Sequence, residues 1–273
     1  MKTSGIITLT TDFGLSDPYL GAMKGVILSI NRHARLVDIS HQVKPGHIFR
    51  GAGVLKEAYS YFPNGTIHIA VVDPGVGGNR RPIALNTDEH FFVGPDNGIF
   101  WPVIKKHEDV QIAHLTEARY FLPHMSHTFH GRDIFAPAAA HISCGVDLLE
   151  MGPAISDPVQ LEFPTPQRKG DILSGQIVRI DHFGNLITNI HQENLEGFLG
   201  GGRPSIGVRN EHIEGLCEKY SDVDEGEMLL LIGSSGYLEI AVNLGRACDR
   251  LSLDPESIVG VEIEVRCGGR VSV

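Results

Sequence analysis

Apolar and polar residues follow two alternating patterns through the first 160 residues of the chain. Short runs of apolar and β-branched residues, typical of buried strands, occupy 5–12, 35–40 and 66–73. Between these runs, apolar residues recur every three to four positions over 17–31 and 48–62, which predicts helices. Strands that alternate with helices predict an α/β domain built on a mostly parallel sheet with helices on both faces. Further strands are expected at 82–87, 90–98 and 110–116, and a helix containing a proline at 132–145.

The pattern changes at residues 156–171, where three prolines and a polar ending predict a linker. Beyond it, short apolar runs are separated by turns with little sign of helix, which predicts a small β-barrel or a sandwich. We therefore predict an α/β domain over residues 1–160 and an all-β domain over residues 171–273. The predicted strands of the second domain are 174–181, 185–190, 204–210, 227–233, 237–243 and 259–266.

Net charge and cysteine spacing narrow the class of protein. The 33 acidic side chains outnumber the 23 basic ones, and the formal charge of −10 argues against binding to nucleic acid or to an anionic membrane surface. A neutral or cationic small molecule is a better partner for such a chain. The four cysteines form no CxxC pair, the N-terminus lacks a signal-peptide pattern, and no apolar run approaches the ~20 residues of a membrane helix. We therefore predict a cytoplasmic protein with reduced thiols.

The stretch VVDPGVGGNRR, residues 71–81, places one acid and two arginines around a glycine-rich turn. Asp73 follows a predicted strand, as Asp12 does earlier in the chain, and ligands of parallel sheets bind beyond the carboxyl ends of the strands. The glycines alone would suit a phosphate-binding loop. However, no third glycine opens a helix, and the lysine and hydroxyl of a P-loop are missing. The acid and Arg80 therefore indicate catalysis rather than phosphate binding.

Histidines spaced by three residues raise the question of a metal site. His124, His127 and His130 could hold a metal ion, and together with Asp12 and Asp73 they would suit a metal-dependent hydrolase. The run follows a proline and contains no carboxylate of its own, so ordinary loop histidines fit the pattern better. We therefore predict no metal site.

Two turns carry residues suited to a nucleoside. Asp17 lies between a predicted strand and a predicted helix, where its carboxylate can cap the helix or accept hydrogen bonds from a ribose diol. In RIDHFGNLITNI, Phe183 offers a stacking face, Asn185 an amide and Asp181 a carboxylate. An aromatic ring beside an amide suits a purine, although a hairpin turn with a packed phenylalanine is the simpler explanation.

The chain resembles the S-adenosylmethionine hydrolases that form adenosine, relatives of the fluorinase and chlorinase enzymes. The similarity runs in order through TDFGLSDPYLGAMKG, VVDPGVGGNRR, TFHGRDIFAPAAAH, IDHFGNLITN and SSGYLEIAVN, and thus covers nearly the whole chain. It implies an N-terminal α/β domain and a C-terminal β-barrel. It also implies a homotrimer in which each active site lies between the N-terminal domain of one subunit and the C-terminal domain of its neighbour.

The resemblance also implies roles for individual residues. In the hydrolases a matching Asp, Arg and His set activates water, and the matching residues are Asp73, Arg80 and His130. Gly131 stands where the halogenating relatives have a halide-binding serine, Asp73 stands where they have a tyrosine over the ribose, and the long insertion of the fluorinase is missing. The implied substrate-binding residues are Asp17 at the ribose, Phe183 and Asn185 at the adenine, Asp181 and Ser234 at the methionine end, and in addition Asp12 and Tyr220.

We therefore predict hydrolysis of S-adenosyl-L-methionine to adenosine and L-methionine, without a cofactor, by attack of water at the 5′ carbon. The sulfonium is an excellent leaving group, so the reaction needs neither a general acid nor a metal, but it does need a desolvated water in line with the departing sulfur. An arginine beside an aspartate favours the ionised carboxylate, and a histidine within reach can share the water's proton. The alternatives are a non-catalytic sensor of S-adenosylmethionine or adenosine and the metal-dependent hydrolase.

Overall fold

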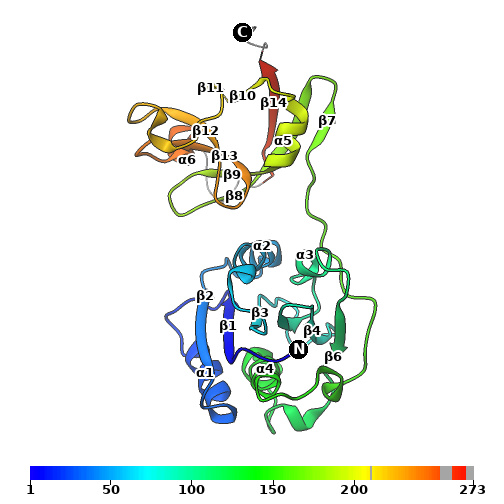
Figure 1. Ribbon diagram of the computed structural model, residues 1–273. Coiled ribbons are helices and arrows are strands. Elements are labelled where there is room, and N and C mark those ends of the chain that lie inside the picture. Colours follow the sequence, from blue (N-terminus) through cyan, green and yellow to red (C-terminus); the bar gives the residue numbers. More distant parts are fainter. Residues whose placement is uncertain (210, 253–259, 269–273) are drawn as a thin grey trace. The chain divides into compact units, whose positions relative to one another are not determined.

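The computed structural model of the chain describes residues 1–209, 211–252 and 260–268. The chain divides into two units, Met1–Leu161 and Glu162–Val273 (Figure 1). The predicted strands 204–210 and 259–266 each include one residue, Asn210 and Val259, that lies outside the described part. Within the described residues, no helix is long and apolar enough to cross a membrane.

The N-terminal unit is built on a six-stranded sheet of the predicted kind. In spatial order its strands are β2 (Arg35–Ser40), β1 (Ile6–Thr11), β3 (Ile67–Val71), β5 (Phe91–Pro95), β4 (Pro82–Asn86) and β6 (Gln111–His114). The first four run parallel, and β4 is antiparallel to both of its neighbours. Every residue of β3 and β5 is buried, as expected for strands covered on both faces.

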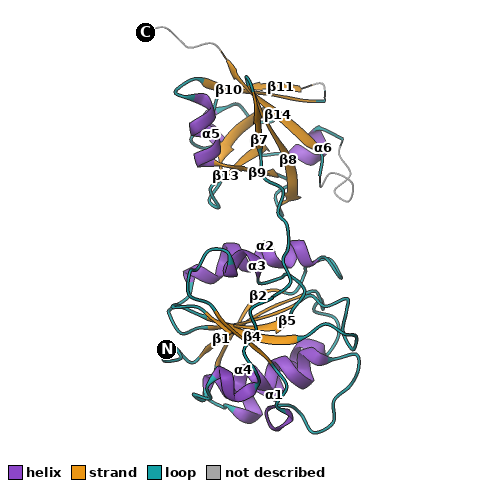
Figure 2. Ribbon diagram, turned by 90° about the vertical axis from the view of Figure 1, so that its right-hand side faces the viewer, coloured by secondary structure: helices purple, strands orange, loops and turns teal. Residues whose placement is uncertain are grey.

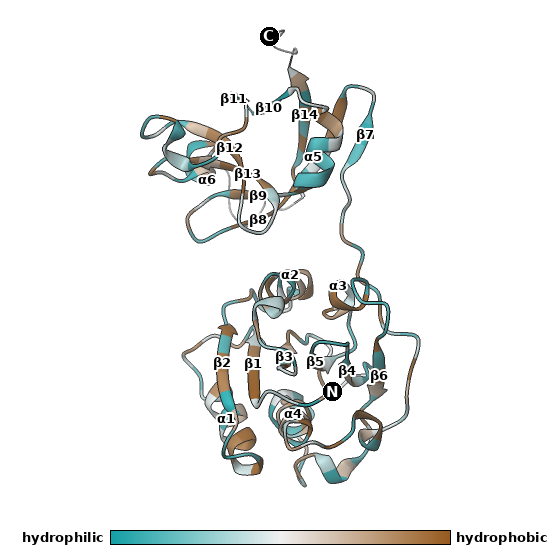
Figure 3. Ribbon diagram, in the orientation of Figure 1, coloured by the Kyte–Doolittle hydropathy of each residue, from teal (hydrophilic) through white to brown (hydrophobic). Residues whose placement is uncertain are grey.

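Two pairs of helices cover this sheet, one pair on each face (Figure 2). α2 (Ile48–Ala58) and α3 (Trp101–Ile104) lie on one face, and α1 (Tyr19–Ile30) and α4 (Ala136–Ser143) lie on the other. The small alanine side chains of α4 let its backbone approach α1 and the sheet closely. β1 contains no charged residue, whereas β2 at the sheet edge mixes charged and apolar residues (Figure 3). The predicted α/β class is confirmed. Buried residues of the core include Met23, Ile27, Ile69, Ala138 and Ala139.

α1 begins without the aspartate cap that the sequence suggested. The first helical residue is Tyr19, Pro18 occupies the N-cap position, and no side chain caps the first turn. Asp17 lies one residue further out and is exposed. The interpretation of Asp17 as a helix cap is therefore wrong, because a proline stands where the capping side chain would have to be.

The predicted proline-containing helix begins with a single π-helical turn, Gly131–Phe135, and continues as α4. Pro137 explains this change of winding, because it has no N–H to donate to the carbonyl of Asp133 four residues earlier. That carbonyl accepts instead from the N–H of Leu122 at 3.0 Å. π-Helical turns are rare and occur frequently at functional sites. This one directly follows His130, one of the predicted catalytic residues.

The second unit contains a nearly closed antiparallel barrel, which confirms the predicted β-barrel. The two ends of the sheet approach each other where the N–H of Cys217 donates to the carbonyl of Leu230 at 2.8 Å. A short strand, β7 (Gln167–Lys169), pairs with β8 outside the main order. In spatial order the other strands are β11 (Glu211–Glu214), β10 (Arg203–Val208), β14 (Glu262–Gly268), β8 (Ile172–Ile180), β9 (Leu186–His191), β13 (Tyr237–Val242) and β12 (Met228–Ile232).

The second unit also contains helix that the sequence did not predict. α5 (Gln192–Leu199) follows β9, and α6 (Ala247–Arg250) is a single turn. The side chain of His191 caps α5 at its start, and Gly200 ends it in the left-handed conformation. Only Leu195 and Phe198 of α5 are buried, so its two turns offer too few apolar positions to form a periodic pattern.

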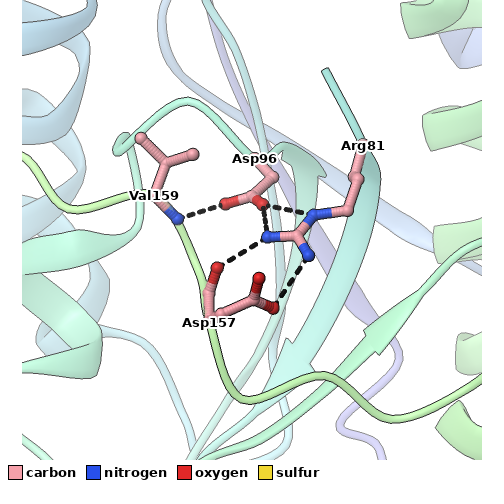
Figure 4. Close-up of polar contacts among 4 residues, drawn as sticks. All are labelled: Arg81, Asp96, Asp157 and Val159. Atoms are coloured by element: carbon pink, nitrogen blue, oxygen red, sulfur yellow. Dashed lines mark hydrogen bonds and ion pairs between the residues drawn. The ribbon is translucent and has the colours of Figure 1, made fainter. Parts of the chain in front are cut away.

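The first residues of the predicted linker are fixed to the N-terminal unit (Figure 4). Arg81 donates to Asp96 through Nε at 2.9 Å and Nη2 at 2.6 Å, and to Asp157 through Nη1 at 2.8 Å. The other carboxylate oxygen of Asp96 accepts from the N–H of Val159 at 2.8 Å. Residues 157–159 therefore belong to the N-terminal unit, and the second unit begins at Glu162.

Candidate active site

An aspartate and an arginine form a buried ion pair at the carboxyl end of β3. Asp73 follows the strand by two residues, and Arg80 returns to it from the far end of the β3–β4 loop. Nε of Arg80 donates to Oδ1 of Asp73 at 3.0 Å and to Oδ2 at 2.9 Å, and Nη2 also donates to Oδ2. The side chains of Arg80 and Asp73 are only 10% and 5% exposed. A forked pair of this kind places a positive charge beside the carboxylate and also fixes the orientation of the carboxylate.

His130 joins this pair through the same guanidinium. Nη2 of Arg80 lies 2.7 Å from Nδ1 of His130. Because a guanidinium only donates, Nδ1 must accept, and the imidazole carries its proton on Nε2. Burial lowers the pKa of His130 from its usual value, and the positive charge of Arg80 lowers this pKa further. The imidazole is therefore neutral at physiological pH, in one defined tautomer.

The loop that carries Asp73 and Arg80 packs against the segment that ends in His130. Gly77 has a φ of 74°, and a Cβ at this position would collide with the carbonyl oxygen of His127. Glycine is the residue that allows this close approach in this conformation. On the other side, the guanidinium of Arg80 lies over the ring of Phe135, 5.2 Å from its centroid. Gly77 therefore serves the packing of two loops that meet at Arg80.

A cavity of about 390 Å³ opens beside these side chains in the N-terminal unit. Its volume lies in the range of small-molecule sites. Phe13, Tyr19 and Phe129 form part of its wall and pack edge to face, with ring centroids 5.2 to 6.1 Å apart. The other lining residues are Asp12, Val71, Asp73, Val76, Ser126, Thr128, His130, Gly131 and Arg132.

A second carboxylate, Asp12, lines the same cavity at the end of β1. Its Oδ2 accepts from the N–H of Gly46 at 2.8 Å. Burial raises the pKa of Asp12, the hydrogen bond from Gly46 opposes this effect, and the negative charge of Asp73 adds to it. A cation near both carboxylates would relieve their repulsion. Arg80 is paired with Asp73 and Arg132 with Asp133, so Asp12 adds negative charge to the cavity, which suits a ligand that carries positive charge.

The residues proposed for a metal-dependent hydrolase do not form a ligand set. Within the described residues, no group of three or more His, Cys, Asp or Glu side chains could hold a metal ion. His124 and His127 are exposed. Arg80 donates to both Asp73 and Nδ1 of His130, so these two side chains share a guanidinium.

A second group of polar side chains meets at the turn between β8 and β9. The backbone N–H of Asn185 donates to Oδ1 of Asp181 at 2.9 Å, and its Nδ2 donates to Oδ2 at 3.0 Å. Tyr220, which begins a 3₁₀ helix (Tyr220–Asp222), places its hydroxyl 3.4 Å from Nδ2 of Asn185 and 3.5 Å from Oε2 of Glu239. Burial raises the pKa of Tyr220, and the negative charge of Glu239 raises it further. The protonated hydroxyl therefore links Asn185 to Glu239.

Phe183 projects from the tip of this turn. It is 71% exposed, which leaves the face of its ring available for stacking. The next residue, Gly184, has a φ of 90°, and the side chain of Arg246 occupies the space that a Cβ would need. Arg246 also donates to the carbonyl of His182 at 3.1 Å and so holds the turn in place. Ser234 is exposed in the turn between β12 and β13.

Comparison with known proteins identifies the family. A model of the N-terminal domain of the SAM hydroxide adenosyltransferases matches residues 7–152, and a model of their C-terminal domain matches residues 175–260. The chain belongs to the SAM hydroxide adenosyltransferase family. The resemblance inferred from the sequence motifs is thereby confirmed.

Relatives of this SAM hydroxide adenosyltransferase family member cover most of the chain. A (R)-S-adenosyl-L-methionine hydrolase from Salinispora arenicola is 37% identical over 98% of this chain and 100% of its own. A fluorinase from an Actinoplanes species is 28% identical over 87% of this chain and 91% of its own. The crystal structure of an uncharacterized conserved protein from Thermotoga maritima superposes with a TM-score of 0.86 at 35% identity, covering 95% of this chain and 99% of that one.

Most of the predicted site residues fall into two groups, one in each unit. Asp17 is exposed and is not among the residues that line the cavity. Ser234 and Phe183 are exposed at turns of the barrel. The first group contains Asp12, Asp73, Arg80 and His130, and the second contains Asp181, Asn185 and Tyr220.

Glu239 belongs to the second group, although it was not among the site residues predicted from the sequence. Its side chain lies on β13 and is only 6% exposed. Charged residues are almost never fully buried unless they have a partner. The signal was present in the sequence, because one carboxylate interrupts the apolar strand YLEIAV.

Proposed function

We propose that this member of the SAM hydroxide adenosyltransferase family hydrolyses S-adenosyl-L-methionine to adenosine and L-methionine. The observation that carries the proposal is the buried group of Asp73, Arg80 and His130 beside a cavity lined by two carboxylates. S-Adenosyl-L-methionine carries a positive charge on its sulfonium, which suits such a cavity. A relative at 37% identity that is named (R)-S-adenosyl-L-methionine hydrolase supports the same activity.

The reaction is a displacement at the 5′ carbon of the ribose. The oxygen of water forms a bond to this carbon while the bond from carbon to sulfur breaks, and the electron pair of that bond goes to sulfur. The sulfonium becomes the neutral thioether of methionine, and the attacking water loses one proton. Since sulfur leaves without being protonated, the protein has to position and desolvate the water and accept its hydrogen.

Each member of the buried group has a distinct role in this step. Asp73 accepts the hydrogen of the attacking water, and Arg80 holds both carboxylate oxygens in one orientation. Nδ1 of His130 is occupied by Arg80, so we assign its Nε2–H as a donor that positions the water oxygen. In this assignment His130 orients the water, and the proton goes to Asp73.

The second unit supplies the groups that we propose for the rest of the substrate. Phe183 and Asn185 bind the adenine, and Asp181, Ser234 and Tyr220 bind the methionine end. We further propose a homotrimer in which the cavity of one subunit faces the turn between β8 and β9 of its neighbour. The resemblance to the hydrolases and halogenases supports this arrangement.

Product formation tests the proposed reaction directly. Incubation with S-adenosyl-L-methionine is expected to yield adenosine and L-methionine in equal amounts, and exhaustive EDTA treatment should leave the rate unchanged. Liquid chromatography measures both products. An Arg80→Ala sample purified in parallel controls for a contaminating activity. Binding without turnover would instead indicate a sensor, and a loss of activity restored by zinc or magnesium would indicate a metal-dependent hydrolase.

Asp17→Ala is expected to weaken adenosine binding with little effect on stability. Asp17 is exposed and caps no helix, so the free energy of unfolding should change by less than about 0.5 kcal/mol. Loss of a charged acceptor for the ribose should weaken affinity about 10- to 100-fold. Calorimetry and urea unfolding measure the two effects, with Asp109→Ala, another exposed aspartate, as the control. Unchanged adenosine affinity would remove Asp17 from the site.

A further inference from the structure

The β3–β4 loop has to cross over the end of another strand. β5 lies between β3 and β4 in the sheet, parallel to β3 and antiparallel to β4. The chain that leaves β3 at Val71 and enters β4 at Pro82 therefore passes over the carboxyl end of β5. This loop carries Asp73 near its start and Arg80 near its end. The residues that follow β5, Asp96 and Asn97, contact both ends of the loop.

Asn97 holds the start of the loop. Its Nδ2 donates to the carbonyl of Val72 at 2.8 Å, directly before Asp73. Its Oδ1 accepts from the N–H of Ile99 at 3.2 Å, which fixes the orientation of the amide. A side-chain amide that donates on one side and accepts on the other has one preferred orientation. The position of the Asp73 backbone is therefore tied to the end of β5.

Asp96 holds the other end of the loop, directly after Arg80. Its carboxylate is 2% exposed and accepts two hydrogen bonds from the guanidinium of Arg81 (Figure 4). Its backbone N–H donates to the carbonyl of Arg81 at 2.9 Å. Two contacts from the side chain and one from the backbone restrict both the position and the direction of the chain at Arg81.

We propose that Asp96 and Asn97 are positioning residues, which set the two ends of the β3–β4 loop and thereby the contacts among Asp73, Arg80 and His130. The loop needs such support for two reasons. It contains three glycines, whose backbone can adopt many conformations, and it lies between β3 and β4 without forming part of a strand. Nη2 of Arg80 has to donate to both Oδ2 of Asp73 and Nδ1 of His130. A shift of about 1 Å in such a group can lower a rate about 100-fold. The effect on turnover rests on the proposed hydrolysis, whereas the effect on geometry does not.

Asn97→Ala and Asp96→Asn test the proposal through the tautomer of His130. In the wild type, the ¹⁵N shifts of the His130 ring should report an unprotonated Nδ1 and a protonated Nε2. His130→Ala identifies this signal among those of the 14 histidines. In both variants, loosening of Arg80 should move the two shifts toward the average of the two tautomers. With S-adenosyl-L-methionine, kcat should fall about 10- to 100-fold, while KM should stay within about threefold.

Two matched variants separate positioning from general stability. Asp157→Ala removes the second carboxylate that accepts from Arg81. The side chain of Asp157 is 76% exposed, and its removal should leave both the ¹⁵N shifts and kcat unchanged. Ile112→Val removes a buried methyl group from β6, the edge strand next to β4, where Ile112 lies opposite Leu85 and not opposite the loop, and should likewise leave both unchanged. In an Arg80→Ala background, Asn97→Ala should lower kcat by no more than about threefold further, because the group it positions is already broken.

Each outcome decides the proposal. Wild-type ¹⁵N shifts in both variants, an unchanged kcat, or an equal loss of kcat with and without Arg80 would overturn it. If the wild type forms no adenosine, the proposed hydrolysis fails by itself, and the ¹⁵N shifts alone decide whether Asp96 and Asn97 set the geometry of the group.

Discussion

Replacing Asp73, Arg80 or His130 is expected to lower kcat about 100- to 10,000-fold, the range typical of acid–base groups. Arg80 donates to both Asp73 and His130, so its removal frees both side chains, and Asp73 and His130 are the proposed contacts of the attacking water. Adenosine affinity should change little, because the proposed ribose and adenine contacts are made by other residues. The comparison uses Asp73→Asn, Arg80→Ala and His130→Ala, with kcat from steady-state kinetics and adenosine affinity from calorimetry.

A double variant decides whether the three side chains act as one unit. Arg80→Ala combined with His130→Ala should be little slower than Arg80→Ala alone, because losses within a unit are not additive. His124→Ala, which removes an exposed histidine of the same run, serves as the control and should keep its kcat. If the single losses multiply, or if His130→Ala keeps near-normal kcat, the three do not share one task and His130 is an ordinary loop histidine.

Much of the fold could be predicted because its elements bury apolar residues with clearly different periods. RLVDIS was predicted as a strand and forms β2 with the same bounds, Arg35–Ser40. The apolar spacing from residue 48 predicted a helix, and α2 begins at Ile48. The period of such a pattern follows from the repeat of a helix or a strand, so it can be recognised from residues close together in the sequence.

The elements that the sequence did not predict depend on single residues or on very short segments. The start of α1 is set by Pro18, which stands where a capping side chain was expected. The π-helical turn before α4 arises because Pro137 cannot donate to Asp133, and Leu122 from another segment takes over that carbonyl. α5 buries only two side chains, too few for a periodic signal. In the first two cases a single proline overrides the local pattern, and in the third the pattern is too short to be recognised.

The residues of the candidate site could be predicted from the sequence, but the contacts between their side chains could not. The sequence placed Asp73 and Arg80 at the two ends of a glycine-rich turn, which made their ion pair plausible. The contact of Arg80 with Nδ1 of His130 joins residues 50 positions apart and requires the packing of two loops. That contact also sets the tautomer of His130, which no sequence pattern encodes. The sequence therefore suggested a histidine that shares the water's proton, and the geometry favours one that donates a hydrogen bond.

Co-assembly of two inactive variants is expected to restore about a third of the wild-type activity, if each active site combines two subunits. Arg80→Ala disables the cavity of the N-terminal unit, and the double variant Asp181→Ala with Asn185→Ala disables the second unit. A trimer that contains both variants has two chains of one kind and one of the other. Going round its ring, about one site in three combines an intact cavity with an intact turn from its neighbour.

Co-expression of the two variants with different affinity tags, followed by sequential purification on both tags, yields the mixed assemblies. Each variant purified alone measures the background, and wild-type chains with the same two tags measure full activity. A chain that carries all three substitutions, co-expressed with Arg80→Ala, is the matched control, because no assembly of these two chains contains an intact cavity. Recovery of adenosine formation in the mixed sample but not in this control would place the two halves of the site on different subunits. If each site were built within one chain, no mixture could contain an intact site, and activity at the background level would overturn the proposed trimeric arrangement.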